Sequence, residues 1–205
     1  MNAKPAGVIL AGGRSSRMAG VRKALITLQD EALLAHVIRR LQPQTDTLVL
    51  STEGQDSGLD VFGLPVVPDI LPRYRGPLTG LCSALQYLAE KQHDGGLVLC
   101  PCDAPFVPLD LAERLVAEGR RKANPVVAVS YEGVLQPTFS LWQINHLPLI
   151  HDAVVRRGQG GLKHMLYSLP HEIIEWIPSE PPPFYNVNTP EELSAAAQWL
   201  ERSGS

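Results

Sequence analysis

Apolar residues follow two different periods along the chain. Four short stretches are wholly or almost wholly apolar, at residues 7–10, 47–50, 64–67 and 97–100. Runs of this length, bounded by glycine, proline or polar residues, predict buried β-strands. Between them apolar residues recur at every third or fourth position, over residues 33–41 ahead of Pro43, 77–89 and 109–121. That spacing predicts helices, and Pro77 suits the first turn of the second one.

The order of these elements indicates the fold class. Short apolar strands that alternate with helices predict a parallel sheet covered on both faces and joined by right-handed crossovers. We therefore expect an α/β protein with a mostly parallel central sheet.

The second half of the chain has a different pattern. It predicts strands at 126–130, 135–142 and 173–177, and helices at 147–155 and 162–169 with a glycine break at 158–161. Residues 178–185 read PSEPPPFY, which predicts a loop because proline is excluded from helix interiors and central strands. A last helix is expected from Pro190, capped by Asn188 or Thr189.

The composition narrows the class of partners. The chain has 205 residues, 44% of them hydrophobic and 19% charged, which suits a single domain with a substantial core. A net charge of −3 gives no overall field for nucleic acid, so an anionic substrate must meet a local basic patch. We find no apolar run of membrane-spanning length and no signal core in the first ten residues. We expect a cytoplasmic protein with neither nucleic-acid nor membrane partners.

The strand at residues 7–10 ends in a loop that is small, flexible and basic. Residues 8–23 read VILAGGRSSRMAGVRK. In an open α/β sheet ligands bind at the carboxyl ends of the strands, where glycine lets the backbone approach phosphate oxygens closely. The loop matches neither a P-loop nor the dinucleotide pattern GxGxxG. Its cations are candidates for phosphate binding, with a purely solvating role as the alternative: Arg14, Arg17, Arg22 and Lys23.

A candidate metal ligand follows another strand. Residues 97–105 read LVLCPCDAP, and two residues separate Asp103 from the end of the apolar stretch at 97–100. At the same sheet edge it could coordinate Mg²⁺, which prefers one or two carboxylates together with substrate phosphates. Asp69 follows the strand at 64–67 in a similar position, and a turn or capping role is the alternative for both. The chain shows no competing nucleophile motif or histidine cluster at metal-binding spacing. Its cysteines are expected to be reduced thiols: Cys82, Cys100 and Cys102.

Five stretches together resemble the molybdenum cofactor guanylyltransferases, a branch of the nucleotidyltransferases. They are LAGGRSSRMAGVRKAL, PDILPRYRGPLTGL, CPCDAPFVP, QPTFSLW and NVNTPEEL, in this order. The resemblance implies a Rossmann-like three-layer nucleotidyltransferase fold. It also implies transfer of GMP from Mg·GTP to the terminal phosphate of molybdenum-carrying molybdopterin, with release of pyrophosphate. GTP and molybdopterin would be the substrates, and molybdoenzymes and other cofactor-biosynthesis proteins the partners.

The resemblance also implies roles for individual residues. Residues up to about 110 would bind the nucleotide, and residues from about 111 to 205 the pterin cofactor. The nucleotide contacts it implies are Leu10, Ala11, Gly12, Gly13, Lys23, Ser51, Asp69 and Asp103, where Lys23 meets the phosphates and Asp103 binds Mg²⁺. The pterin contacts it implies are Arg17, Gly20, Asn186 and Asn188. Lys23, Arg17 and Mg²⁺ on Asp103 would neutralise the two polyanions that react, so no strong base is required.

Two departures from the family pattern leave alternatives open. Ser51 stands where relatives often have asparagine, and residues 158–161 are GQGG where bacterial relatives often have arginine; Lys163 could supply that charge. The nearest rival is a cytidylyltransferase that uses CTP. Those chains tend to read LAAG and to carry glycine in place of Cys102, so both positions favour GTP. A non-catalytic cofactor-binding relative is the second rival, although both Lys23 and Asp103 are present.

Overall fold

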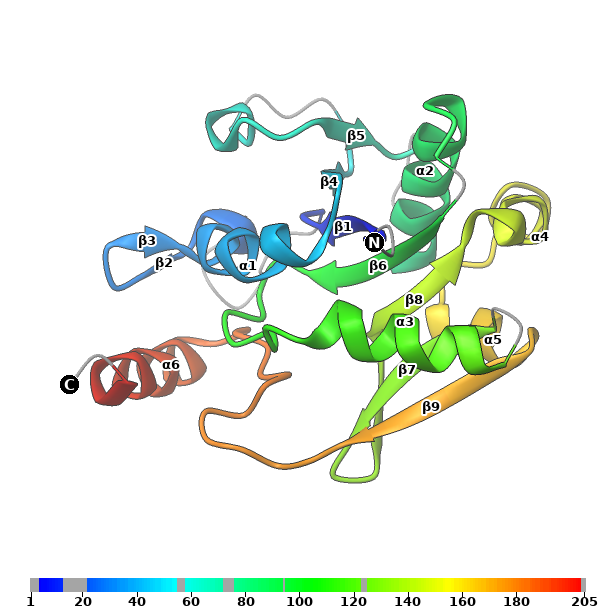
Figure 1. Ribbon diagram of the computed structural model, residues 1–205. Coiled ribbons are helices and arrows are strands. Elements are labelled where there is room, and N and C mark those ends of the chain that lie inside the picture. Colours follow the sequence, from blue (N-terminus) through cyan, green and yellow to red (C-terminus); the bar gives the residue numbers. More distant parts are fainter. Residues whose placement is uncertain are drawn as a thin grey trace.

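The computed structural model describes residues 4–12, 22–54, 58–71, 76–93, 95–122 and 125–203. In these residues a seven-stranded sheet lies between two layers of helices, and a two-stranded hairpin stands beside it (Figure 1). The α/β class with a mostly parallel central sheet, predicted from the apolar pattern, is confirmed.

The first half of the chain forms the parallel part of the sheet, whose full strand order is β5-β4-β1-β6-β8-β7-β9. Strand β1 (Ala6–Leu10) pairs in parallel with β4 (Leu48–Thr52) and β6 (Gly96–Pro101), and β4 pairs in parallel with β5 (Val66–Pro68). Every residue of β4 is buried, as expected for a strand covered on both faces. The carboxyl ends of these four strands lie along one edge of the sheet.

The second half adds three strands, one of which is reversed. β8 (Val134–Gln143) runs antiparallel to both β6 and β7 (Val126–Tyr131), and β9 (His171–Trp176) pairs in parallel with β7. Glu132 and Gly133 turn the chain between β7 and β8 with positive φ values of 50° and 73°. Two successive positive φ angles are typical of tight hairpin turns. The sequence did not indicate this reversal, because glutamate gives no turn signal at the first of these positions.

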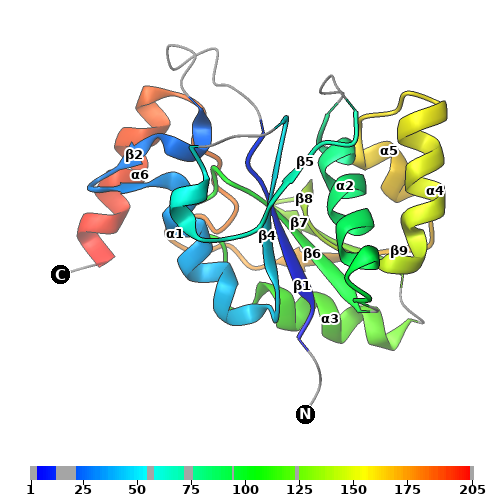
Figure 2. The same cartoon turned by 90° about the horizontal axis from the view of Figure 1, so that it is seen from above.

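The helices form a layer on each side of the sheet (Figure 2). One layer contains α1 (Leu33–Leu41) and α3 (Leu111–Arg121), and the other contains α2 (Pro77–Glu90), α4 (Leu147–His151) and α5 (Leu162–Tyr167). A π-helical segment, Asp152–Arg156, continues α4, so the helix expected at 147–155 is present with an altered second half. Two hydrophobic clusters, one per face, make up the main core.

A third, smaller cluster joins segments that are far apart in the sequence. It connects the hairpin of β2 (Thr27–Leu28) and β3 (Glu31–Ala32) with α6 (Pro190–Ser203), and it includes Phe106 and Val187. Trp199 of α6 meets Phe106 edge to face, with ring centroids 5.8 Å apart. The apolar pattern did not indicate this hairpin, because two-residue strands are too short to show a period.

Two sequence expectations concern membrane-spanning helices and the state of the cysteines. Of the helices in the described residues, none combines the length and apolar character needed to cross a bilayer. Cys82, Cys100 and Cys102 are all buried and free of disulfides, as predicted.

Candidate active site

The ends of the central strands are fastened to one another by backbone hydrogen bonds. The Cys102 N–H donates to the Leu10 carbonyl at 3.2 Å, and the Ala11 N–H donates to the Ser51 carbonyl at 2.8 Å. These contacts align the residues that follow β1, β4 and β6. Because the sheet already uses the Ala11 N–H, backbone donors for a bound ligand must come from Gly12 onward.

Three residues that are remote in the sequence meet at this edge. The Lys23 ammonium donates to Asp103 Oδ2 at 2.9 Å and also to the side-chain oxygen of Asn188. Lys23 opens the short 3₁₀ turn Lys23–Leu25, Asp103 follows β6, and Asn188 precedes α6. The structure therefore brings together the candidate phosphate-binding cation, the candidate metal ligand and one of the candidate pterin residues.

Burial makes the Lys23–Asp103 contact important. Asp103 is only 7% exposed, and an ionised carboxylate this deeply buried is costly without a nearby cation. Lys23 supplies that cation, and its side chain remains 25% exposed toward solvent.

The segment at 186–188 is held against the same strand end. The Val187 N–H donates to the Asp103 carbonyl at 2.8 Å, and Asn188 Nδ2 donates to the Asn186 carbonyl at 3.2 Å. The Asn186 side-chain oxygen is buried and accepts no hydrogen bond from any described residue. A buried acceptor of this kind is costly unless it is paired, so it is suited to a donor from a ligand.

A capping box fixes the backbone just after Asn188. Thr189 Oγ1 accepts from the Glu192 N–H at 3.2 Å, while Glu192 Oε2 accepts from the N–H groups of Thr189 and Asn188 at 3.0 and 2.6 Å. Thr189 is therefore the cap of α6, which decides between the two candidates left by the sequence. Its partner in the box, Glu192, lies in the first turn of the helix. The Thr-x-x-Glu spacing is a sequence signal that could have identified it as part of the box.

A second polar group lies at the ends of β4 and β5. The Asp69 N–H donates to the Thr52 carbonyl at 2.8 Å, and Ser51 is 2% exposed. Burial, the larger cause, and the negative charge of Glu53 together raise the pKa of Asp69 to about 6, against the opposing effect of a hydrogen bond from Ser51. Glu53 was missed in the sequence, where an exposed glutamate after a strand carries no signal.

Two glycines of α2 allow backbone segments to approach closely at this edge. A Cβ on Gly80 would lie 2.6 Å from Ser51 Oγ and 2.7 Å from Leu10 Cδ2, so the helix could not pack here with a larger residue. Gly76 has a φ of 117°, and a Cβ there would collide with the Gly160 carbonyl, which accepts from the Leu78 N–H at 3.1 Å. Gly160, within the glycine break at 158–161, thus forms a backbone contact with the start of α2.

The remaining candidates are placed as follows. Gly12 lies just beyond β1, where a Cβ would be 3.4 Å from Glu53 Cγ. Lys163, the suggested substitute for the missing arginine, is exposed on α5. Burial and the charge of Asp103 raise the pKa of the Cys102 thiol, which keeps it protonated beside the site. Several loop candidates lie outside the described residues: Gly13, Arg14, Arg17 and Gly20.

Comparison with known proteins decides the family. The model described as the MobA-like NTP transferase domain matches residues 7–173. The chain belongs to the MobA-like NTP transferase family. A molybdenum cofactor guanylyltransferase from Cupriavidus pinatubonensis is 37% identical over 193 residues, covering 91% of this chain and 93% of the relative. The MobA-like chain is therefore a nucleotidyltransferase, as its five motifs indicated.

Solved structures agree on the fold of this MobA-like chain. A molybdopterin-guanine dinucleotide biosynthesis protein A from Archaeoglobus fulgidus superposes with a TM-score of 0.79 at 19% identity, covering 96% of this chain and 99% of that one. A Mycobacterium tuberculosis protein solved in complex with manganese superposes with a TM-score of 0.69 at 19% identity, covering 96% and 99%. The nucleotidyltransferase fold is thereby confirmed.

The donor set of the MobA-like site fits a hard divalent cation. No cluster of three or more histidine, cysteine, aspartate or glutamate side chains suited to a metal occurs among the described residues. Asp103 instead offers one buried carboxylate beside the Lys23 ammonium. Magnesium commonly binds through one or two carboxylates and completes its shell with water and substrate phosphates.

Proposed function

We propose that this protein transfers GMP from GTP to the terminal phosphate of molybdenum-carrying molybdopterin, which yields the guanine dinucleotide cofactor and pyrophosphate. The observation that carries the proposal is the Lys23 ammonium bridging Asp103 and Asn188 at the carboxyl edge of a MobA-like sheet. The guanylyltransferase name of its relative at 37% identity favours GTP over CTP.

The nucleotide half of the proposed site comprises the ends of β1, β4, β5 and β6. Gly12 and Gly13 would supply close backbone contacts to the triphosphate, and Lys23 a compact charge for its oxygens. Ser51 and Asp69 would face the nucleoside, and Leu10 and Ala11 at the end of β1 would contact the nucleotide beside them. A nucleotide-binding role for the chain up to about residue 110 is consistent with this placement.

The pterin half would lie beyond Asp103, on the chain from about residue 111 onward. Asn188 and Asp103 both accept from the Lys23 ammonium, and Asn186 has a buried acceptor. Amide oxygens of this kind could accept from the N–H groups of a pterin. Arg17 and Gly20 would complete this half from the basic loop.

In the proposed reaction, an oxygen of the molybdopterin phosphate attacks the α-phosphorus of GTP while the bond to pyrophosphate breaks. The nucleophile is already an anion, so no residue has to remove a proton from it. Lys23 would offset the repulsion between the two substrates, and Asp103 would hold Mg²⁺ at the triphosphate. The cation, when bound, supplies charge neutralisation at the phosphates. The manganese complex of a protein with the same fold supports a divalent cation here.

Calorimetric titration with GTP, CTP and ATP in the presence of Mg²⁺ tests the proposed substrate. We expect GTP to bind at least about tenfold more tightly than the other two, because a site that hydrogen-bonds one base leaves polar groups unpaired with another. A preference for CTP would contradict the guanylyl assignment and leave the fold and the metal site unaffected. Binding that is unchanged in Asp103→Asn would contradict the assignment of Asp103.

A further inference from the structure

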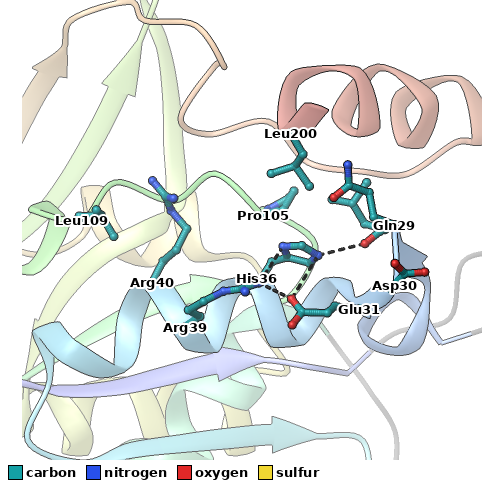
Figure 3. A pocket seen from close by; sticks show the side chains of 10 residues that line it. Gln29, Asp30, Glu31, His36, Arg39, Arg40, Pro105, Leu109 and Leu200 are labelled. Carbon is teal, nitrogen blue, oxygen red and sulfur yellow. Dashed lines mark hydrogen bonds and ion pairs between the residues drawn. The ribbon is translucent and has the colours of Figure 1, made fainter. Parts of the chain in front are cut away.

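A separate pocket of about 600 Å³ lies between the β2–β3 hairpin, α1, the segment after Asp103 and α6 (Figure 3). We call it the hairpin pocket; its lining includes His36, Arg39, Arg40, Leu109 and Leu200. The volume is in the range of small-molecule sites. None of the residues assigned above to the nucleotide or the pterin lines it.

The charges on one side of the hairpin pocket compensate one another. Arg39 Nη2 donates to Glu31 Oε2 and, at 3.2 Å, to His36 Nδ1. His36 Nε2 lies 3.1 Å from the Leu28 carbonyl, which can only accept, so this nitrogen carries the proton. Both ring nitrogens of His36 and the carboxylate of Glu31 are thus engaged within the protein, as the dashed lines in Figure 3 show.

Arg40 is the cation that this network leaves without a counter-charge; Asp30 also lines the pocket, on the hairpin and away from Arg40 in Figure 3. Its Nε donates to the Val107 carbonyl at 2.5 Å, and its two terminal nitrogens contact no acceptor among the described residues. Burial lowers the pKa of Arg40 and the positive charge of Arg39 lowers it further, with no carboxylate acting in the opposite direction. A partly buried guanidinium without a counter-charge is unfavourable unless an anionic ligand pairs with it or water hydrates it.

The hairpin pocket also has an apolar wall next to this cation. Pro105, Leu109 and Leu200 line it, and Leu109 is 65% exposed. A guanidinium fixed at Nε presents its remaining N–H groups as a planar fork, which suits two oxygens of one carboxylate or phosphate. The exposed leucine beside it would be covered by an apolar group attached to that anion.

We propose that the hairpin pocket binds a small organic anion, namely a carboxylate or phosphate carried on an apolar body. The anion pairs with the terminal nitrogens of Arg40, and the apolar body covers Leu109 and Leu200. This site is independent of the proposed nucleotidyl transfer, because its residues take no part in that reaction.

The test is calorimetric titration with benzoate and phenyl phosphate, using acetate and inorganic phosphate as probes that lack the apolar body. Wild-type protein should bind the aromatic probes more tightly than the matching small anions. Arg40→Gln should lower the affinity for the aromatic probes by about tenfold or more, which is the effect of losing a charge-assisted hydrogen bond. Arg121→Gln removes the same charge from an exposed position on α3 outside the pocket, and it should bind as wild type.

A second variant covers the case in which Arg40→Gln does not fold. Leu109→Asp places a negative charge, the same sign as that of the probes, in the pocket. Leu109 is exposed, so the variant should fold, and it should no longer bind the aromatic probes. Comparison of benzoate with phenyl phosphate identifies which anion the fork prefers. The proposal is overturned if wild-type protein binds neither aromatic probe, or if the pocket variants bind them as tightly as Arg121→Gln does.

Discussion

At the scale of single residues, Lys23 and Asp103 form a largely buried ion pair at the proposed site. The two groups lie 2.9 Å apart, and Asp103 is almost completely buried. Removing the Lys23 ammonium leaves the buried Asp103 carboxylate without a counter-charge. This change lowers the free energy of unfolding more than breaking an exposed ion pair of the same geometry would.

We therefore predict that Lys23→Met lowers the free energy of unfolding by about 1–3 kcal/mol. Adding Asp103→Asn in that background should recover part of the loss, because the stranded charge disappears. Urea unfolding of the two single variants and the double variant measures this coupling. The matched control is Lys122→Met, which breaks an exposed ion pair with Glu172 and should cost at most about 1 kcal/mol. Additive effects of Lys23→Met and Asp103→Asn would contradict the pairing.

The raised pKa of Asp69 predicts a pH dependence of stability. Its pKa rises from 3.8 to about 6 in the folded protein. The folded state then holds the proton more tightly, so wild-type stability falls as pH rises between these two values. Asp69→Asn removes that loss, and its melting temperature should increase relative to wild type from about pH 4 to pH 7. Melting curves across this range check it, with exposed Asp46→Asn as the control; a constant difference for Asp69→Asn would be the contrary result.

Sequence patterns identified the residues of this site unequally. Asp103 and Lys23 could be predicted, because a carboxylate after a buried strand and a lysine at the end of a glycine loop are patterns in themselves. Glu53 could not, since its role depends on the distance between β4 and β5. The contact between Lys23 and Asn188 joins residues 165 positions apart, and spacing along a chain does not report contacts of that separation.

At the scale of elements, the α6 capping box links helix stability to the position of Asn188. We predict that Thr189→Ala lowers the free energy of unfolding by about 1 kcal/mol, the usual effect of losing a cap. Ser194→Ala is the control: its hydroxyl donates to the Pro190 carbonyl inside the same helix and is exposed, so we expect little change. Chemical denaturation compares the two, and equal effects would argue against a special role for Thr189.

Most elements could be predicted from the apolar period, and the exceptions have physical reasons. The buried strands and the amphipathic helices bury a repeating face, and that repeat is visible in the sequence. The β2–β3 hairpin has two residues per strand and is held by packing on α6 instead. The direction of β8 is set by a tight turn at Glu132 and Gly133. The positive φ angles of these two residues cannot be predicted from an apolar pattern.

At the scale of the whole molecule, the two proposed halves share one sheet. β6 of the first half pairs with β8 of the second, and both main hydrophobic clusters contain residues of both halves. We therefore predict a single cooperative unfolding transition in scanning calorimetry, with equal calorimetric and van't Hoff enthalpies. Two resolved transitions would show that the halves fold independently.

We propose that the strand edge carrying Lys23 and Asp103 is where GMP is joined to molybdopterin. The most direct measurement follows label from α-phosphate-labelled GTP into the pterin dinucleotide, in the presence of Mg²⁺ and molybdenum-carrying molybdopterin. We predict transfer by the wild-type protein, and a loss on the order of a hundredfold or more in Lys23→Met, which lacks the charge that offsets substrate repulsion. No labelled dinucleotide from the wild-type protein, or undiminished transfer by Lys23→Met, would contradict the account.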